Sequence, residues 1–154
     1  MRIGVISDTH GLLRPEAIAA LVAFAPQHIL HAGDVGDPAI LDALARIAPV
    51  TAIRGNIDIA GPCAELPPTE YVELANKAFY LVHSIHDLDI DPMAAGVSVV
   101  VSGHSHQPSV ETRRDVLYLN PGSAGPRRFK LPVTLALVTL ADSISAQIVD
   151  LLPV

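Results

Sequence analysis

The sequence predicts an α/β fold built from two facing, mixed β-sheets that are flanked by helices. In the first third of the chain, short apolar runs alternate with segments of helical spacing, an order typical of parallel strands joined by crossover helices. In the second half, pairs of apolar runs are joined by short turns, which predicts antiparallel hairpins. A parallel half followed by antiparallel strands favours two facing sheets with helices outside.

The first half of the chain is expected to contain three strands and two helices. The strands are predicted from short aliphatic runs: residues 1–7, 28–33 and 50–53. The helices are predicted from two segments in which apolar residues recur at helical spacing after a proline: residues 15–24 and 38–47. Pro26 and Pro49 forbid their continuation. Residues 54–68 contain three prolines among Gly, Asn and Asp, and predict a long loop beside the functional crevice.

The second half is expected to contain three hairpins and one further strand. The hairpins are predicted from three pairs of apolar runs: residues 69–74 with 78–82, 109–112 with 116–119, and 133–140 with 144–151. Each pair is separated by a turn-like triplet, such as Ala75-Asn76-Lys77. The further strand is the valine-rich run at residues 97–103.

Length and composition narrow the class of protein. A chain of 154 residues fits one domain, residues 1–154. No apolar stretch approaches the roughly 18 to 20 residues of a membrane span, and the polar residues Asp8 to His10 come too early for a signal peptide, so we expect a cytoplasmic protein that does not enter membranes. Cys63 is the only cysteine, which excludes an internal disulfide. A net charge of −6 argues against general nucleic-acid binding.

Polar side chains follow five of the apolar runs. Each of these side chains is a common metal ligand: Asp8, Asp34, Asn56, His83 and His104. Because the carboxyl ends of strands line the ligand crevice of open α/β sheets, we expect all five at one edge. Asp8 and His10 are two residues apart, as are His104 and His106, and in extended backbone such pairs point to the same side. Gly103 permits close approach to the second pair.

The seven polar residues supply enough donors for two metal ions. They offer three oxygen and four nitrogen donors: Asp8, Asp34, Asn56, His10, His83, His104 and His106. Mixed oxygen and imidazole ligation favours manganese, iron, zinc, cobalt or nickel over calcium or magnesium. Two ions about 3.5–4 Å apart, bridged by a carboxylate, are the recurring arrangement for displacement at phosphorus.

In this order the motifs resemble those of the calcineurin-like metallophosphoesterases. The small size and the segment Asn120-Pro121-Gly122-Ser123 are similar to their short bacterial and archaeal phosphodiesterase branch. The resemblance runs from Met1 to about Arg128 and implies a four-layer αββα sandwich with a binuclear site. It also implies the ligand sets: Asp8, His10 and His106 for one ion, Asn56, His83 and His104 for the other, and Asp34 between them.

The resemblance implies a metal-dependent phosphoesterase, with a phosphodiesterase preferred. A hydroxide held between two ions, most readily manganese, would attack phosphorus in line. Asp34, Asn56 and His83 are the expected catalytic residues, and the expected partner is a small phosphate ester. Two alternatives stay open: a phosphomonoesterase, and a non-catalytic scaffold such as the small retromer subunit, which resembles this fold. Association into a homodimer or homotetramer is expected from relatives.

The chain departs from the family pattern at two places. Ile57 stands where larger phosphatases have a histidine and many small phosphodiesterases have a cysteine, so general-acid help from that position is absent. Relatives show His-Gly-His where this chain reads His83-Ser84-Ile85-His86, which displaces His86. His86 and Arg127 are nevertheless the candidate substrate-binding residues.

Two further polar residues have roles that the sequence leaves open. His31 alternates with the apolar face of its strand, so it is either a core residue or a partner of Asp34. Asp58 either orients neighbouring backbone and ligands or is an ordinary turn residue.

Overall fold

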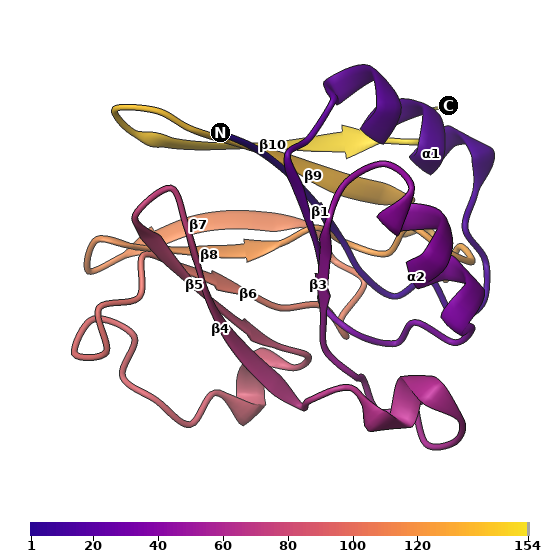
Figure 1. The fold of residues 1–154 in the computed structure, drawn as a ribbon, viewed down its shortest axis with the longest axis horizontal. Coiled ribbons are helices and arrows are strands. Elements are labelled where there is room, and N and C mark those ends of the chain that lie inside the picture. The colour runs from indigo at the N-terminus through magenta and orange to yellow at the C-terminus, as the bar shows by residue number, and fades with distance from the viewer. Residues whose placement is uncertain (154) are drawn as a thin grey trace.

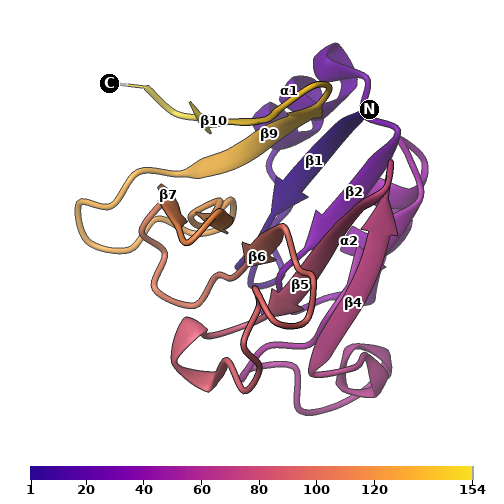
Figure 2. The same ribbon diagram turned by 90° about the vertical axis from the view of Figure 1, so that its left-hand side faces the viewer.

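The computed structural model describes residues 1–153 and contains two five-stranded sheets packed face to face (Figure 1, Figure 2). The strands of the first sheet are β1 (Arg2–Ile6), β2 (His28–His31), β3 (Val50–Ala52), β9 (Thr134–Leu140) and β10 (Ile144–Asp150). The strands of the second sheet are β4 (Thr69–Leu74), β5 (Lys77–Val82), β6 (Val99–Val101), β7 (Ser109–Arg113) and β8 (Val116–Asn120).

Both sheets are mixed, as the sequence predicts. The first has the order β10-β9-β1-β2-β3, in which β1 runs parallel to β2 and antiparallel to β9. The second has the order β4-β5-β6-β8-β7, with parallel pairing of β6 to β5 and β8 and antiparallel pairs at both edges. The strands β1, β2 and β3 are therefore parallel, and the three hairpins are antiparallel pairs, as the sequence predicts.

The main core lies between the two sheets, and it follows from residue alternation along each strand. Ile3 and Val5 of β1 face Phe79 and Leu81 of β5 across this layer. Ile6, the next residue of β1, faces the opposite way, into a second cluster formed with the helices. A strand buried on both faces has no polar alternation, which explains the continuous apolar runs in the sequence.

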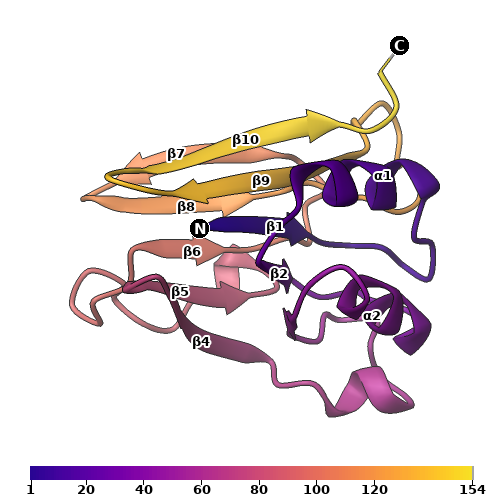
Figure 3. The same cartoon turned by 45° about the horizontal axis from the view of Figure 1, so that its top comes forward.

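Two α-helices, α1 (Pro15–Phe24) and α2 (Pro38–Ala45), cover the outer face of the first sheet (Figure 1, Figure 3). The helix α1 ends at Ala25, whose left-handed backbone donates to the carbonyls of Leu21 and Val22 before Pro26. The helix α2 begins at Asp37, whose carboxylate accepts the Ala39 N–H at 2.9 Å. It ends two residues before the predicted Ile47, because its last turn tightens: the Ile47 N–H donates to Leu44.

The outer face of the second sheet is covered by a loop. Tyr80 and Val82 of β5 pack there against Ile85 and Leu88 of the segment that contains the 3-10 turn η2 (Ile85–Asp87). The other 3-10 turn, η1 (Pro62–Glu65), lies in the predicted long loop. The α/β fold of two facing mixed sheets is thus confirmed, and within residues 1–153 both of its α-helices lie on the first sheet. No helix in this range is long and apolar enough to cross a membrane.

Two of the three predicted turns are shorter than expected. Ala75 and Asn76 alone connect β4 to β5, since Lys77 already pairs with Leu74. Both turn residues have positive φ, 48° and 65°, and so do the two residues that connect β7 to β8. Two left-handed residues in succession match the right-handed twist of the flanking strands, which explains why the turn closes one residue early.

Gly4 of β1 provides a test of the packing between the first sheet and α1. A Cβ at position 4 would lie 2.5 Å from the Leu21 Cδ2, and Leu21 is fully buried. We expect Gly4→Ala to lower the free energy of unfolding by about 1–3 kcal/mol through overpacking, and Leu21→Ala to lower it by about 2–5 kcal/mol. The double variant should be more stable than Leu21→Ala alone, because the new methyl group occupies the vacated space. Urea unfolding of the four proteins measures this coupling, and additive costs would contradict it.

Candidate metal centre

Loops at one edge of the two sheets bring the candidate ligands together. Two groups each place one ligand atom per residue within 4.8 Å of the others: Asp8, His10 and His106 form the first, and Asp34, His83 and His104 form the second. These residues follow strands β1, β2, β5 and β6. The seventh candidate, Asn56, follows β3 and places its Oδ1 3.1 Å from the His104 Nδ1.

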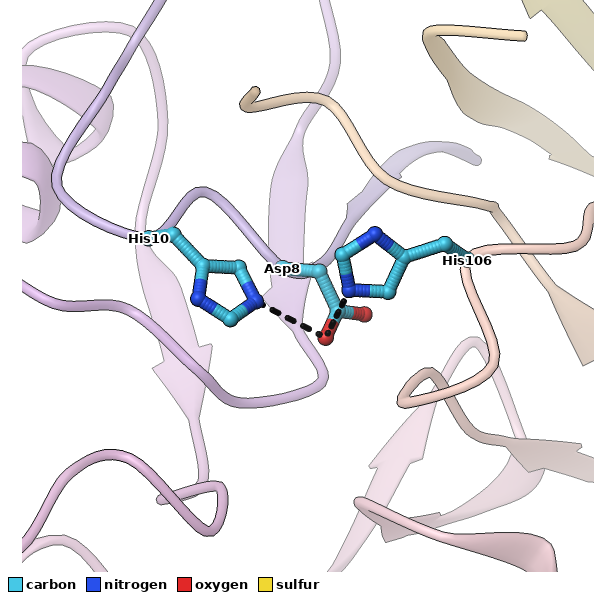
Figure 4. Close-up of side chains that lie close together, drawn as sticks. All are labelled: Asp8, His10 and His106. Atoms are coloured by element: carbon cyan, nitrogen blue, oxygen red, sulfur yellow. Dashed lines mark ion pairs between the residues drawn. The ribbon is translucent and has the colours of Figure 1, made fainter. Parts of the chain in front are cut away.

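In the first group, two imidazoles face one carboxylate oxygen (Figure 4). The Nε2 atoms of His10 and His106 lie 3.7 Å and 3.4 Å from the Asp8 Oδ1. The Asp8 carboxylate is fully buried, as the loops close over it. Three donors of this kind, one oxygen and two nitrogens, can share one ion.

Asp34 links the two groups. Its Oδ2 lies 3.2 Å from the His83 Nε2 in the second group and 3.4 Å from the His10 Nε2 in the first. The His83 Nε2 also lies 3.8 Å from the Asp8 Oδ1. The groups are therefore adjacent, and Asp34 stands between them.

The backbone reaches this arrangement in a way that the sequence did not predict. The prediction of extended backbone at the pairs Asp8/His10 and His104/His106 was wrong. The backbone is left-handed at five candidate ligands: Asp8, His10, Asp34, His104 and His106. In consequence Asp8 and His10 belong to the same group, whereas His104 and His106 belong to different groups. A left-handed conformation costs a non-glycine residue about 1–2 kcal/mol, and five of them at one site indicate a backbone held for function.

Two glycines allow the loops to approach the carboxylates. A Cβ at Gly103 would strike the Ser7 hydroxyl and the Asp8 Oδ2, and a Cβ at Gly55 would strike the Asp34 side chain and backbone. Any other residue at these positions would push the carboxylates away from the imidazoles. Gly103 therefore has the role predicted for it, although the group that it contacts is Asp8.

Hydrogen bonds fix three of the ligands so that one atom of each stays free. The Asp8 Oδ2 accepts the Ser7 hydroxyl at 2.7 Å and the His104 N–H at 3.0 Å, which leaves Oδ1. The Asp34 Oδ1 accepts the Ile57 N–H at 3.0 Å, which leaves Oδ2. The His83 Nδ1 donates to the Ala32 carbonyl at 2.7 Å, so its Nε2 carries a lone pair. Partners of this kind orient metal ligands in proteins.

The atoms left free identify the kind of group that the site can hold. Within residues 1–153, four buried side-chain atoms have no hydrogen-bond partner: Asp8 Oδ1, His10 Nε2, His83 Nε2 and His106 Nδ1. Such atoms are rare in native proteins, and all four belong to candidate ligands. The His10 Nε2 and the His83 Nε2 lie 3.7 Å and 3.8 Å from the Asp8 Oδ1, so three of the four atoms surround the same point. A cluster of carboxylate oxygens and imidazole nitrogens fits a divalent transition metal.

The carboxylates of Asp8 and Asp34 are ionised. Burial raises the pKa of Asp8, but His10, His106 and the Ser7 hydroxyl outweigh it and hold the pKa well below its usual range. Burial likewise raises the pKa of Asp34, and the adjacent His83 imidazole and the hydrogen bond from the Ile57 N–H reverse this, so that the pKa is lowered. Both carboxylates are thus charged at neutral pH and attract cations.

Two polar residues outside the predicted set support the ligand loops. Asp58 is buried, and its carboxylate accepts the N–H groups of Val35, Gly36 and Gly55, which joins the loops after β2 and β3. The Asn120 side chain donates to the Gly103 carbonyl at 3.0 Å. The orienting role left open for Asp58 is the one that the structure shows. Nothing in the sequence around these residues indicates their long-range partners.

His31 is a satisfied core residue. It is fully buried, its Nδ1 accepts the Gly33 N–H at 3.1 Å, and its Nε2 donates to the Thr9 hydroxyl at 3.1 Å. The Thr9 hydroxyl in turn donates to the Val35 carbonyl at 2.8 Å. These bonds connect the backbone of the loops after β1 and β2, and none of them involves Asp34.

The two candidate substrate-binding residues are both exposed. His86 is exposed on η2 and does not line the cavity beside the second group. Arg127 is exposed, and its guanidinium donates to the carbonyls of Leu131 and Leu152. That cavity, of about 630 Å³, is lined instead by residues that include Arg54, Asp87 and Asp89.

Fold and site together define an α/β protein of two facing sheets with a candidate metal centre at one sheet edge. The sequence profile of the calcineurin-like phosphoesterase superfamily domain matches residues 1–143. A probable metallophosphoesterase of Methanothermobacter thermautotrophicus is 35% identical over 159 residues, which cover 97% of this chain and 92% of that protein. The chain therefore belongs to the calcineurin-like phosphoesterase superfamily, as its motifs indicate.

Solved structures agree in fold. A structure described as a novel archaeal phosphodiesterase has a TM-score of 0.80 and 23% identity, with 97% of this chain and 100% of that chain covered. Vps29 of Chaetomium thermophilum has a TM-score of 0.78 and 18% identity, with 97% of each chain covered. The fold is thus shared by a protein described as an enzyme and by one named Vps29.

Gly103 offers a test of the close approach to Asp8. We expect Gly103→Ala to weaken binding of manganese by about 10–100-fold, because the new methyl group displaces Ser7 and Asp8, and changes behind metal ligands have effects of this size. Gly4→Ala, a change to a buried glycine outside the metal centre, is the matched control and should leave the affinity unchanged. Calorimetric titration of the chelated proteins measures both, and equal affinities in all three proteins would contradict the geometry.

His31 makes stability depend on pH. Burial lowers its pKa from 6.5 to about 4. The unfolded chain takes up the proton first, so the contribution of His31 is complete above about pH 6.5 and is lost as pH falls toward 4. Between pH 7 and pH 4.5 we expect the chelated wild type to lose about 2 kcal/mol more free energy of unfolding than His31→Asn. Parallel losses in urea unfolding at the two pH values would show that His31 does not titrate in this way.

Proposed function

We propose that this chain is a binuclear metal-dependent phosphoesterase that prefers phosphodiesters. The observation that carries the proposal is the pair of adjacent donor groups joined by Asp34. Asp8, His10 and His106 would hold one divalent ion, Asn56, His83 and His104 would hold the other, and Asp34 would contact both. Two bound ions would supply Lewis-acid chemistry by neutralising phosphoryl oxygens and activating water as the nucleophile.

The residues of the chain position the reacting groups. His83 is held by its bond to Ala32, so its Nε2 cannot turn away from the reaction centre. Asn56 directs its Oδ1 toward the second group, which leaves its NH₂ as a donor for a phosphoryl oxygen. Ile57 carries no titratable group, so the position that is histidine or cysteine in relatives does not protonate the leaving group. We therefore expect esters with good leaving groups to react fastest.

The preference for diesters has two supports. A solved structure of the same fold is described as an archaeal phosphodiesterase. The cavity beside the second group is lined by two carboxylates, Asp87 and Asp89, and by one guanidinium, Arg54. A monoester dianion is repelled by such a wall more strongly than a diester monoanion. Manganese is the proposed metal, since the donors combine carboxylate, amide and imidazole.

A scaffold function is the second candidate, and it is favoured by the likeness in fold to Vps29. All seven donor residues are nevertheless present and gathered at one edge. A surface that serves only as a scaffold does not need five left-handed residues and buried atoms without hydrogen-bond partners at the same place. This convergence supports catalysis over a scaffold.

Hydrolysis of bis(p-nitrophenyl) phosphate tests the proposed function. We expect the chelated protein to be inactive and to regain activity with manganese at about two ions per chain. The monoester p-nitrophenyl phosphate should react more slowly than the diester. Two bound ions without hydrolysis of either ester would favour the scaffold.

Ligand variants test the assignment of residues. We expect Asp34→Asn and His104→Ala to lower kcat at least about a hundredfold, because even residues behind metal ligands change activity by 10–100-fold. His28→Ala is the control: His28 begins β2 at the end away from the ligands and bonds the Thr51 hydroxyl. Near-normal turnover in Asp34→Asn would refute the role of Asp34, provided that circular dichroism shows an intact fold.

A further inference from the structure

The cavity beside the second ligand group has the size of a binding site for a small molecule. Its volume is about 630 Å³, and part of its wall is formed by Asn56, His83 and His104. His83 is only 7% exposed, and its Nε2 has no hydrogen-bond partner. The cavity therefore opens directly on the proposed reaction centre. Its volume is within the range of small-molecule sites, which is roughly 300–1,000 Å³. It can hold the organic group attached to the scissile phosphate.

The carboxylates that line the cavity are not neutralised by the protein. Asp87 is the last residue of η2, and Asp89 follows after Leu88. Within residues 1–153, no Lys or Arg nitrogen is within 4.0 Å of either carboxylate. The Tyr80 hydroxyl donates to the Asp89 Oδ1 at 3.2 Å, which leaves the other oxygen of Asp89 and both oxygens of Asp87 able to accept.

Arg54 and two hydroxyls add further hydrogen-bonding groups to the same wall. The Arg54 Nη1 donates to the Leu66 carbonyl at 2.9 Å, which holds the guanidinium in place and leaves its other N–H groups as donors. Thr69 and Ser84 contribute hydroxyls that donate and accept. The cavity thus combines carboxylates that accept hydrogen bonds, a guanidinium that donates them, and hydroxyls that do both.

This combination suits one kind of organic group better than others. A cationic group would pair with the carboxylates but be repelled by Arg54, and an anionic group would meet the reverse difficulty. An aryl or alkyl group would displace water from the polar groups of the wall without supplying hydrogen bonds in its place. A hydroxyl group donates to a carboxylate and accepts from a guanidinium at the same time, so several hydroxyls can satisfy the whole wall.

We propose that the cavity binds a polyhydroxylated arm of the phosphodiester, such as glycerol or ribose, and that Asp87 and Arg54 determine this specificity. The proposal rests on the phosphodiesterase function proposed above, because the cavity shares His83 and His104 with that site. Asp87 accepts hydrogen bonds from the hydroxyl groups of the arm, and Arg54 donates hydrogen bonds to its hydroxyl oxygens. No bond is made or broken in the cavity itself.

A matched pair of esters tests the specificity. The probes are p-nitrophenyl glyceryl phosphate and p-nitrophenyl propyl phosphate, which differ only in two hydroxyls. With manganese-loaded protein, we expect kcat/KM to be at least about tenfold higher for the glyceryl ester, the value of one hydrogen bond to a charged group. Asp87→Ala and Arg54→Ala should each lower this ratio about tenfold. Asp42→Ala, which removes an exposed carboxylate of α2 that does not line the cavity, should leave the ratio unchanged.

Binding provides a readout that does not depend on turnover. Calorimetric titration with glycerol phosphate and n-propyl phosphate should show the same preference for the hydroxylated ligand, and the same loss in Asp87→Ala. Equal kcat/KM for the two esters in the wild type would overturn the proposal, and so would faster hydrolysis of p-nitrophenyl phosphorylcholine, whose arm is cationic. A binding preference without hydrolysis of any ester would instead overturn the phosphodiesterase function and keep the assignment of the cavity.

Discussion

Two buried carboxylates at the edge of two sheets constrain the rest of this structure. Asp8 is fully buried and Asp34 is 2% exposed, and their free oxygens both lie close to the His83 Nε2. Like charges in such a place destabilise a fold unless cations neutralise them. Imidazoles and a few N–H and hydroxyl donors surround the two carboxylates. Several buried oxygen and nitrogen lone pairs still have no partner. The site is therefore complete only with a further positive charge, which a metal ion supplies.

The surrounding backbone is arranged to keep these charges together. Left-handed residues turn the loops after β1, β2 and β6 inward, and glycines at positions 55 and 103 let those loops contact the carboxylates directly. Asp58 and Asn120 fasten the loops to one another through backbone groups. The sheets provide the rigid base, since β1, β2, β5 and β6, which precede six of the seven candidate ligands, are buried on both faces. Local strain is thus supported by a well-packed core.

The fold and the set of donor residues could be predicted from the sequence, whereas the pairing of elements and the geometry of the loops could not. Alternation between apolar runs and turn residues identified the strands, and the position of a polar residue after each run predicted the edge where they meet. The order of the strands was not readable: Arg2 of β1 pairs with Thr139 of β9, and no local signal specifies a partner so distant. The left-handed backbone at His104 and His106 was equally hidden, because only tertiary contacts impose it on a residue other than glycine. For the same reason the hydrogen bonds of Asp58 and Asn120 appear only in three dimensions.

Anomalous diffraction from crystals grown with manganese would show directly whether two metal ions bind at this sheet edge. We expect two manganese peaks in every chain, one bound by Asp8, His10 and His106, and the other by Asn56, His83 and His104, with Asp34 in contact with both. A single peak in the chain, or peaks away from these residues, would contradict it, because the buried lone pairs would then remain without the charge that the structure is built to receive.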